Sequence, residues 1–137
     1  KRFPDYKVAI EAFYGRFQEM ITGTYDDNIE IALGLKDKKI PIYILSNFPG
    51  DQFDIYKSKN PFIEKFDDMI ISGKVNLKKP DKKIYELAKE KFNCDPEKTL
   101  FIDDRPENTL SASELGFKTI TLHKPEELKN EIKNFNF

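Results

Sequence analysis

The sequence has one cysteine and one histidine, and each scarcity excludes a kind of site. Cys94 is the only cysteine among 137 residues, so no disulfide can form within the chain. This usage favours a reducing, cytoplasmic setting. His123 is the only histidine, which excludes a metal centre built from several imidazoles.

The chain also lacks an excess of charge of either sign and lacks a long apolar run. It carries 23 basic and 24 acidic side chains, a formal net charge of −1. Balanced charge gives no reason to expect a nucleic acid or an anionic membrane as partner. No apolar run approaches the length needed to cross a bilayer, and no signal-peptide pattern opens the chain. We therefore expect neither nucleic acid nor membrane among its partners.

Apolar and aromatic residues are plentiful and periodic. Hydrophobic residues make up 39% of the chain, enough for one globular domain with a buried core. Their pattern predicts strands that alternate with helices, which favours an α/β fold with a Rossmann-like parallel sheet flanked by helices. The expected strands span residues 40–45, 67–72, 100–102 and 118–122, and the main helices span 28–38, 51–58, 82–92 and 106–115.

The first part of the chain has a different pattern from this core. Between residues 5 and 21, apolar residues recur at spacings of three and four, which predicts a helix with one apolar face. Packing in the core or against a subdomain is the simplest role for that face. A turn at residues 22–24 ends the segment.

The segment from Leu100 to Asn108 carries the most distinctive chemistry. Three apolar residues lead directly into Asp103 and Asp104, and a helical pattern follows shortly after. In open α/β sheets, ligands bind where strands end in this way. Adjacent carboxylates repel each other unless a proton or a cation lies between them, which makes Mg²⁺ a natural ligand. The alternative is a polar turn in which an aspartate caps the helix.

Two further polar groups are predicted at the same edge of the sheet. Ser46 and Asn47 end the strand at residues 40–45, and Lys79 follows the strand at 67–72. The carboxyl ends of parallel strands meet at one edge, so these residues should lie near Asp103 and Asp104. A hydroxyl, an ammonium group and a metal-binding carboxylate pair together suit a phosphoryl group.

These segments together resemble the haloacid dehalogenase superfamily. The resemblance is carried by Leu45-Ser46-Asn47, Lys79-Pro80-Asp81-x-x-Ile84-Tyr85, Phe101-Ile102-Asp103-Asp104-x-x-x-Asn108 and Leu115-Gly116. They match the family's second, third and fourth motifs in order and spacing, over residues 29–122. The best match is to the small-molecule phosphatases with a helical cap, including the domain similar to the N-terminal part of epoxide hydrolases.

The resemblance implies a role for each matching residue. Ser46 would bind the phosphoryl group beside Asn47, and Lys79 would neutralise the phosphoryl group and the nucleophile. Asp104 would ligate Mg²⁺ directly, with Asp103 and Asn108 acting directly or through metal-bound water. The family's metal-free dehalogenases lack the double aspartate, so the resemblance favours a phosphatase over a 2-haloacid dehalogenase.

The family's first motif is absent. That motif is a strand ending in Asp-x-Asp, which supplies the nucleophile and the acid/base, and no Asp-x-Asp occurs in this chain. We therefore expect residues 1–27 to be a remnant of the helical cap and 28–137 to be a core without its central first strand. The missing strand would be replaced by an N-terminal piece, a neighbouring chain or a rearranged strand order, because unpaired strand edges are costly.

The sequence thus predicts a Mg²⁺-dependent phosphatase of a small phosphorylated metabolite, present here as a C-terminal fragment that is inactive by itself. A non-catalytic phosphate- or Mg²⁺-binding or regulatory module is the main alternative. A phospho-receiver domain is a weaker alternative, because receivers place their acid pair before the lysine.

Overall fold

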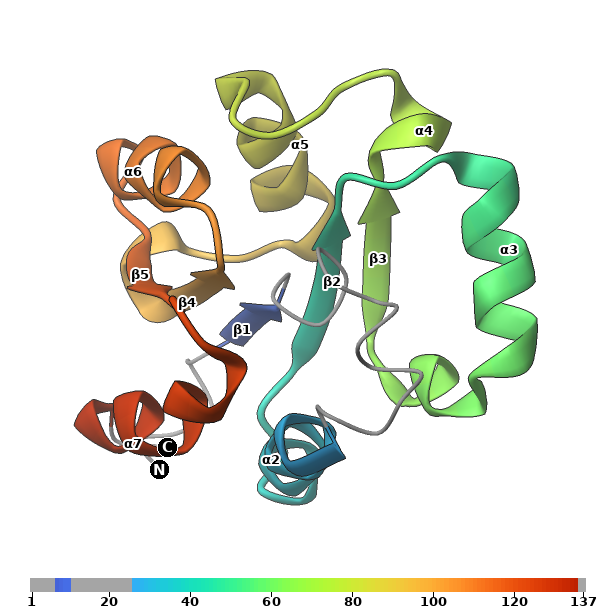
Figure 1. Ribbon diagram of the computed structural model, residues 1–137. Coiled ribbons are helices and arrows are strands. Elements are labelled where there is room, and N and C mark those ends of the chain that lie inside the picture. Colours follow the sequence, from blue (N-terminus) through green and yellow to red (C-terminus); the bar gives the residue numbers. More distant parts are fainter. Residues whose placement is uncertain (1–6, 11–25, 136–137) are drawn as a thin grey trace.

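The computed structural model describes residues 7–10 and 26–135 of the chain. These residues form five strands and the helices that connect them (Figure 1). The elements, including the 3₁₀-helices labelled η, are β1 (Lys7–Ile10), α2 (Asp26–Asp37), β2 (Ile42–Ser46), α3 (Gly50–Lys59), η1 (Pro61–Lys65), β3 (Asp68–Ile71), α4 (Ser72–Val75), α5 (Lys82–Phe92), η2 (Pro96–Lys98), β4 (Thr99–Asp103), α6 (Pro106–Glu114), β5 (Lys118–Thr121), η3 (Pro125–Glu127), α7 (Leu128–Glu131) and η4 (Ile132–Asn134).

The strands form a single parallel sheet in the order β3-β2-β1-β4-β5. The central strand is β1, and its Ile10 aligns with Ile44 of β2 and with Ile102 of β4. The prediction that this chain lacks a central strand was therefore wrong. The gap is filled by the chain's own residues 7–10, which pair on both sides and so satisfy the backbone groups of β2 and β4.

The predicted helix over residues 5–21 is also wrong where the structure describes it. Residues 7–10 form β1, and a three-residue run of valine, alanine and isoleucine after a lysine suits either structure. Partners on both sides decide in favour of the strand, because tertiary pairing outweighs weak local propensity. Assigning residues 7–10 to a cap remnant was accordingly wrong, whereas residues 1–6 and 11–25 of that remnant lie outside the described residues.

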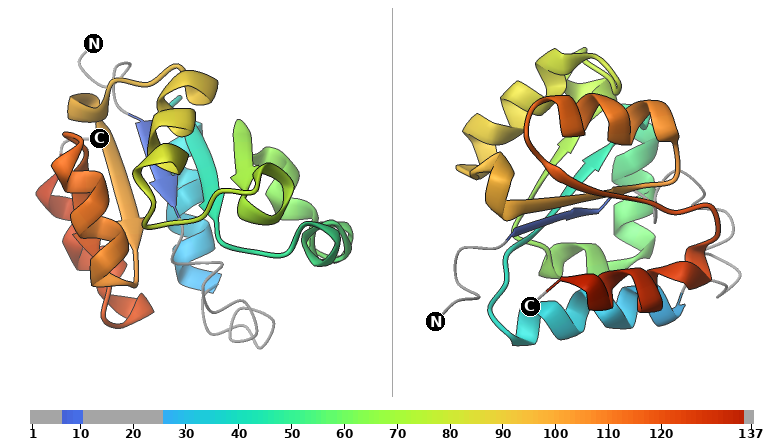
Figure 2. Two further views of the ribbon diagram at one scale, coloured as in Figure 1. Left: turned by 90° about the horizontal axis from the view of Figure 1, so that it is seen from above. Right: turned by 90° about the vertical axis from the view of Figure 1, so that its left-hand side faces the viewer.

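Helices cover both faces of the sheet (Figures 1 and 2). Alternate residues of β2 point to opposite faces: Ile42 and Ile44 join one apolar cluster, and Tyr43 and Leu45 join another. The first cluster packs against α2, α3 and α7, and the second packs against α5 and α6. Continuous burial along β2 and β4 is typical of parallel strands that are covered on both sides.

The other predicted strands and helices are present, with bounds within two residues of the predicted ones for most. The predicted helix at 82–92 coincides with α5, and Asp81 caps it by accepting a hydrogen bond from the Lys83 amide at 2.9 Å. The short helix α4 was not predicted, because its four residues are too few to show a periodic pattern. Within the described residues, no helix combines the length and apolar character needed to cross a bilayer.

Candidate functional site

The candidate site lies at the carboxyl ends of β2 and β4, which flank the central strand β1. The Lys79 side chain joins these two strands across that position. Its ammonium donates one hydrogen bond to the Leu45 carbonyl oxygen at 2.8 Å and another to Asp103 Oδ2 at 2.9 Å. The sequence predicted that the residues at these strand ends lie close together, and Lys79 is in direct contact with both strand ends.

The Asp103 carboxylate accepts hydrogen bonds from three residues. Its Oδ2 accepts hydrogen bonds from the Lys79 ammonium and from Asn108 Nδ2, the latter at 3.1 Å. Its Oδ1 accepts one from the Arg105 backbone N–H at 2.9 Å. The Lys79 and Asp103 side chains are both fully buried. A buried ion pair of this kind is tolerated only when its remaining hydrogen-bonding groups are also satisfied, and here the carboxylate meets that condition.

Asn47 holds the backbone that carries Lys79. Its side-chain oxygen accepts from the Lys79 N–H at 2.9 Å, and its side-chain nitrogen donates to the Lys79 carbonyl oxygen at 3.0 Å. The side-chain amide of Asn47 thus binds both the backbone N–H and the backbone carbonyl oxygen of Lys79. This arrangement ties the segment after β3 to the segment after β2 and fixes the direction from which the lysine enters the site.

Ser46 differs from its neighbours. It is 0% exposed, and its hydroxyl has no hydrogen-bond partner among the described residues. Leaving a buried hydroxyl unpaired costs on the order of 1–3 kcal/mol. A buried hydroxyl that lacks a partner within the protein is a candidate for contact with a ligand.

Asp104 stands beside this network and is partly exposed. Burial raises the pKa of its carboxyl group, and the adjacent Asp103 raises that pKa further through a hydrogen bond and through its charge. A backbone N–H and Arg105 act in the opposite direction. Asp103 has the Lys79 ammonium beside it, so Asp104 is the carboxylate of the site with the less favourable surroundings for its charge.

A hard divalent cation suits this donor set. Mg²⁺ binds oxygen ligands, usually through one or two carboxylates together with water and substrate phosphate. Asp104 offers the less committed carboxylate, while Asp103 and Asn108 supply neighbouring oxygens. Within the described part of the chain, no group of three or more acidic, histidine or cysteine side chains is placed to hold a metal.

Two supporting residues were not singled out as site residues from the sequence. The buried Tyr85 hydroxyl donates to the Asn108 carbonyl oxygen at 2.8 Å, and the Ser111 hydroxyl donates to the Pro80 carbonyl oxygen at 2.7 Å. Both hydrogen bonds join α5 or α6 to backbone that carries a site residue. Each residue fits an ordinary helix pattern, so only the spatial arrangement reveals its role.

All the predicted site residues gather at this edge of the sheet, and the roles assigned to them stay predictions. Asn47, Lys79, Asp103 and Asn108 form one continuous network of hydrogen bonds. Ser46 and Asp104 adjoin that network through the chain. The alternative interpretation of the acid pair, an aspartate that caps the following helix, does not hold for α6. The N-cap residue of α6 is Arg105, and its side chain makes no capping hydrogen bond.

Comparison with known proteins gives a consistent set of relatives. The family described as haloacid dehalogenase-like hydrolase matches residues 2–122. The sesquiterpene phosphatase astK of Aspergillus oryzae is 27% identical over 94 residues, which are 69% of this chain and 47% of that protein. An (S)-2-haloacid dehalogenase of Pseudomonas sp. is 26% identical over 98 residues, or 72% of this chain and 42% of that protein.

A related crystal structure comes from Bacteroides thetaiotaomicron. This enzyme, in complex with magnesium and inorganic phosphate, is 31% identical, with a TM-score of 0.60 over 69% of this chain and 51% of that chain. The present chain spans less than half the length of either curated relative. The family match over residues 2–122 includes the strand-end segments described above.

Proposed function

Because the chain belongs to the haloacid dehalogenase-like hydrolases, we propose that it carries the phosphoryl-binding site of a Mg²⁺-dependent phosphatase that acts on a small phosphoester. The observation that carries the proposal is the Ser46 hydroxyl, which is fully buried and has no partner among the described residues. A phosphoryl oxygen would accept its hydrogen bond. The relatives include a phosphatase and a structure with magnesium and phosphate, and both support this choice.

Each residue of the site then has a task that its contacts favour. Ser46 donates to a phosphoryl oxygen, and Lys79 places a positive charge beside the same group. Asn47 positions the Lys79 backbone, and Asp103 pairs with the lysine and holds its side chain in place. Asp104 would hold Mg²⁺ with help from Asp103 and Asn108, and the bound cation would offset negative charge on the phosphoryl group.

Turnover requires a carboxylate nucleophile that the site as described does not contain. Asp103 is committed to Lys79 and Asn108, and the chain has no Asp-x-Asp. We therefore expect this 137-residue chain to bind phosphate without hydrolysing a phosphoester. Measurable Mg²⁺-dependent hydrolysis of p-nitrophenyl phosphate would contradict that expectation. It would direct attention to Glu11, the carboxylate that follows β1 in the sequence.

Calorimetric titration with inorganic phosphate tests the proposal directly. We expect binding that strengthens on addition of Mg²⁺, and we expect Asp104→Asn to remove the effect of Mg²⁺. Asp37→Asn is the matched control, because Asp37 is an exposed aspartate at the end of α2. No binding of phosphate by the wild-type chain, with or without Mg²⁺, would overturn the proposal.

A non-catalytic phosphate-binding or regulatory module is the second candidate. It is favoured by the missing Asp-x-Asp, which leaves a binding site without the usual nucleophile. The two candidates differ in the whole gene product, which would hydrolyse a phosphoester in the first case and only bind one in the second. Activity of the whole gene product towards 2-haloacids in the absence of Mg²⁺ would instead favour a dehalogenase.

A further inference from the structure

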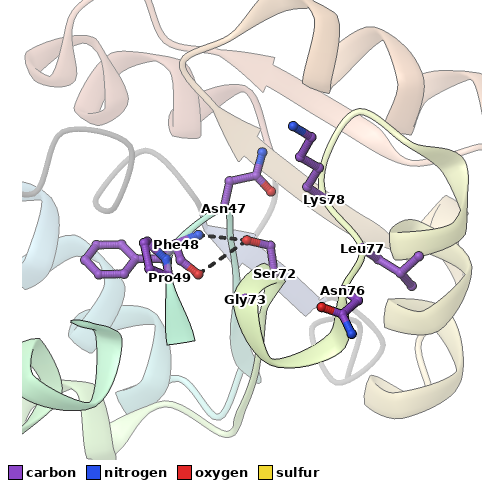
Figure 3. A pocket seen from close by; sticks show the side chains of 8 residues that line it. All are labelled: Asn47, Phe48, Pro49, Ser72, Gly73, Asn76, Leu77 and Lys78. Carbon is purple, nitrogen blue, oxygen red and sulfur yellow. Dashed lines mark hydrogen bonds between the residues drawn. The ribbon is translucent and has the colours of Figure 1, made fainter. Parts of the chain in front are cut away.

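A pocket of about 440 Å³ adjoins the candidate site on the side of β3 (Figure 3). It lies between the loop after β2 and the segment that contains α4. Asn47, which binds the Lys79 backbone, is one of its lining residues, and Lys78 is another. The pocket therefore shares Asn47 with the candidate site, and Lys78 precedes Lys79 in the chain.

The two walls of the pocket are joined to each other by hydrogen bonds. The Phe48 N–H donates to Ser72 Oγ at 2.9 Å, and the Gly73 N–H donates to the Phe48 carbonyl oxygen at 3.0 Å. The two segments approach so closely that a Cβ atom on Gly73 would lie 2.8 Å from that carbonyl oxygen. Glycine is required here by close backbone packing.

The lining combines an apolar part with one positive charge. Phe48 is buried and Leu77 is half-buried, whereas Asn76 and Lys78 are exposed at the opening. Figure 3 shows the Asn47 and Lys78 side chains extending toward the same side. A ligand that extends from Phe48 toward this side would meet the ammonium group of Lys78.

Three of the lysines near Lys78 in the sequence are paired with carboxylates. Lys74 pairs with Asp54 at 2.6 Å, and Lys82 pairs with Glu114 at 3.1 Å. Lys79 is paired with Asp103. Within the described residues, no acidic side chain forms an ion pair with Lys78, so its charge is available to a ligand.

We propose that this pocket binds the leaving group of the substrate and that Lys78 recognises a second anionic group there, such as a carboxylate. This inference rests on the proposed function, because the phosphoryl group must occupy the Ser46–Lys79 site for the remainder to reach the pocket. The substrate class is then a small phosphoester with one further negative charge. Lys78 acts as a specificity-determining residue.

Phosphonates test this inference without requiring turnover. Phosphonoacetate and 3-phosphonopropanoate carry a carboxylate, and ethylphosphonate and propylphosphonate are their counterparts with a methyl group in its place. With Mg²⁺ present, we expect calorimetry to show at least one carboxylate probe binding about threefold tighter than its counterpart, the size expected for an exposed ion pair. Lys78→Gln should abolish this preference. Lys83→Gln should retain it, because Lys83 is an exposed lysine outside the pocket.

The possible outcomes separate this inference from the proposed function. If all four phosphonates bind the wild-type chain equally, or the alkyl probes bind tighter, the second anionic group is wrong and the phosphoryl site stands. If the preference persists in Lys78→Gln, the assignment to Lys78 is wrong. If none of the probes binds, the proposed function fails and this inference fails with it.

Discussion

Asp103 and Ser46 lie at the ends of two strands that flank the same central strand, and both are fully buried. The carboxylate of Asp103 accepts hydrogen bonds from Lys79, Arg105 and Asn108. The hydroxyl of Ser46 has no partner in the described part of the chain. On one side of the site the protein satisfies its own polar groups, and on the other it leaves a buried hydroxyl unpaired within the described residues.

Because the two residues differ in this way, we expect one to contribute to stability and the other to binding. Groups that the protein already satisfies contribute to folding, and their removal should destabilise the chain. A buried group without a partner costs folding free energy, and its removal should affect binding instead. The two halves of the site should therefore respond in opposite ways to substitution.

The largest expected effect is a loss of stability when the Lys79–Asp103 ion pair is broken. Lys79→Met would leave the Asp103 carboxylate buried without its counter-ion, which should lower the free energy of unfolding by about 3–5 kcal/mol. Urea denaturation measures this change. Lys82→Met removes a lysine whose ion pair with Glu114 is exposed, and it should cost less than about 1 kcal/mol. Equal losses in the two variants would contradict the account.

A smaller loss is expected for the residue that supports Asn108. Tyr85→Phe removes the hydroxyl that donates to the Asn108 carbonyl oxygen at 2.8 Å, inside the core. The unfolding free energy should fall by about 1–2 kcal/mol, because a buried carbonyl group loses its side-chain donor. Phosphate affinity should fall as well, since Asn108 helps to hold Asp103. A variant with unchanged stability would show that this hydrogen bond contributes nothing.

Two serine variants compare an unpaired hydroxyl with a hydrogen-bonded one. Ser46→Ala removes an unpaired buried hydroxyl, so the unfolding free energy should stay unchanged or rise by up to about 1 kcal/mol. Ser111→Ala removes a hydroxyl that donates to the Pro80 carbonyl oxygen, and stability should fall by about 1 kcal/mol. Thermal or urea denaturation of both variants tests this opposite response. A clear loss of stability in Ser46→Ala would indicate that its hydroxyl is already satisfied.

The smallest effect concerns the pH dependence of stability in the absence of divalent cations. The pKa of Asp104 is raised above its ordinary value of 3.8 by burial and by Asp103, so the unfolded chain loses this proton first as the pH rises. The contribution of Asp104 to stability is thus present below the ordinary pKa and is lost as the pH passes the raised pKa.

Denaturation with a chelator present, from about pH 3 to about pH 7, measures this dependence. Asp104→Asn should remove the contribution that falls with increasing pH, and Asp37→Asn should leave it in place. Parallel stability curves for the wild-type chain and Asp104→Asn would contradict the assigned environment of this carboxyl group.

Much of the fold could be predicted because its buried strands leave a strong local pattern. The apolar run that contains β2 and the run that ends at Asp103 are covered on both faces, so nearly every residue is hydrophobic until the polar end. The position of the polar residues followed from the same pattern. A parallel sheet brings the carboxyl ends of its strands together, so Ser46, Lys79 and Asp103 were predicted at one edge.

The central strand could not be predicted in this way. Residues 7–10 form a short strand, and in the sequence they lead directly into a segment with helical periodicity. No feature of the local sequence therefore identifies them as a strand. They form a strand because they pair with β2 on one side and with β4 on the other. The contacts of Tyr85 and Ser111 were equally hidden, because a hydrogen bond between helix and loop backbone depends on tertiary placement.

The central claim is that the unpaired hydroxyl of Ser46 is the protein's hydrogen-bond donor to a phosphoryl group. The most direct measurement is a calorimetric titration of inorganic phosphate, with Mg²⁺ present, into the wild-type chain and into a Ser46→Ala variant of equal stability. We predict binding to the wild-type chain and affinity about tenfold or more weaker in the variant, because a hydrogen bond to a charged group is lost. Equal affinity of the two proteins for phosphate would contradict the claim.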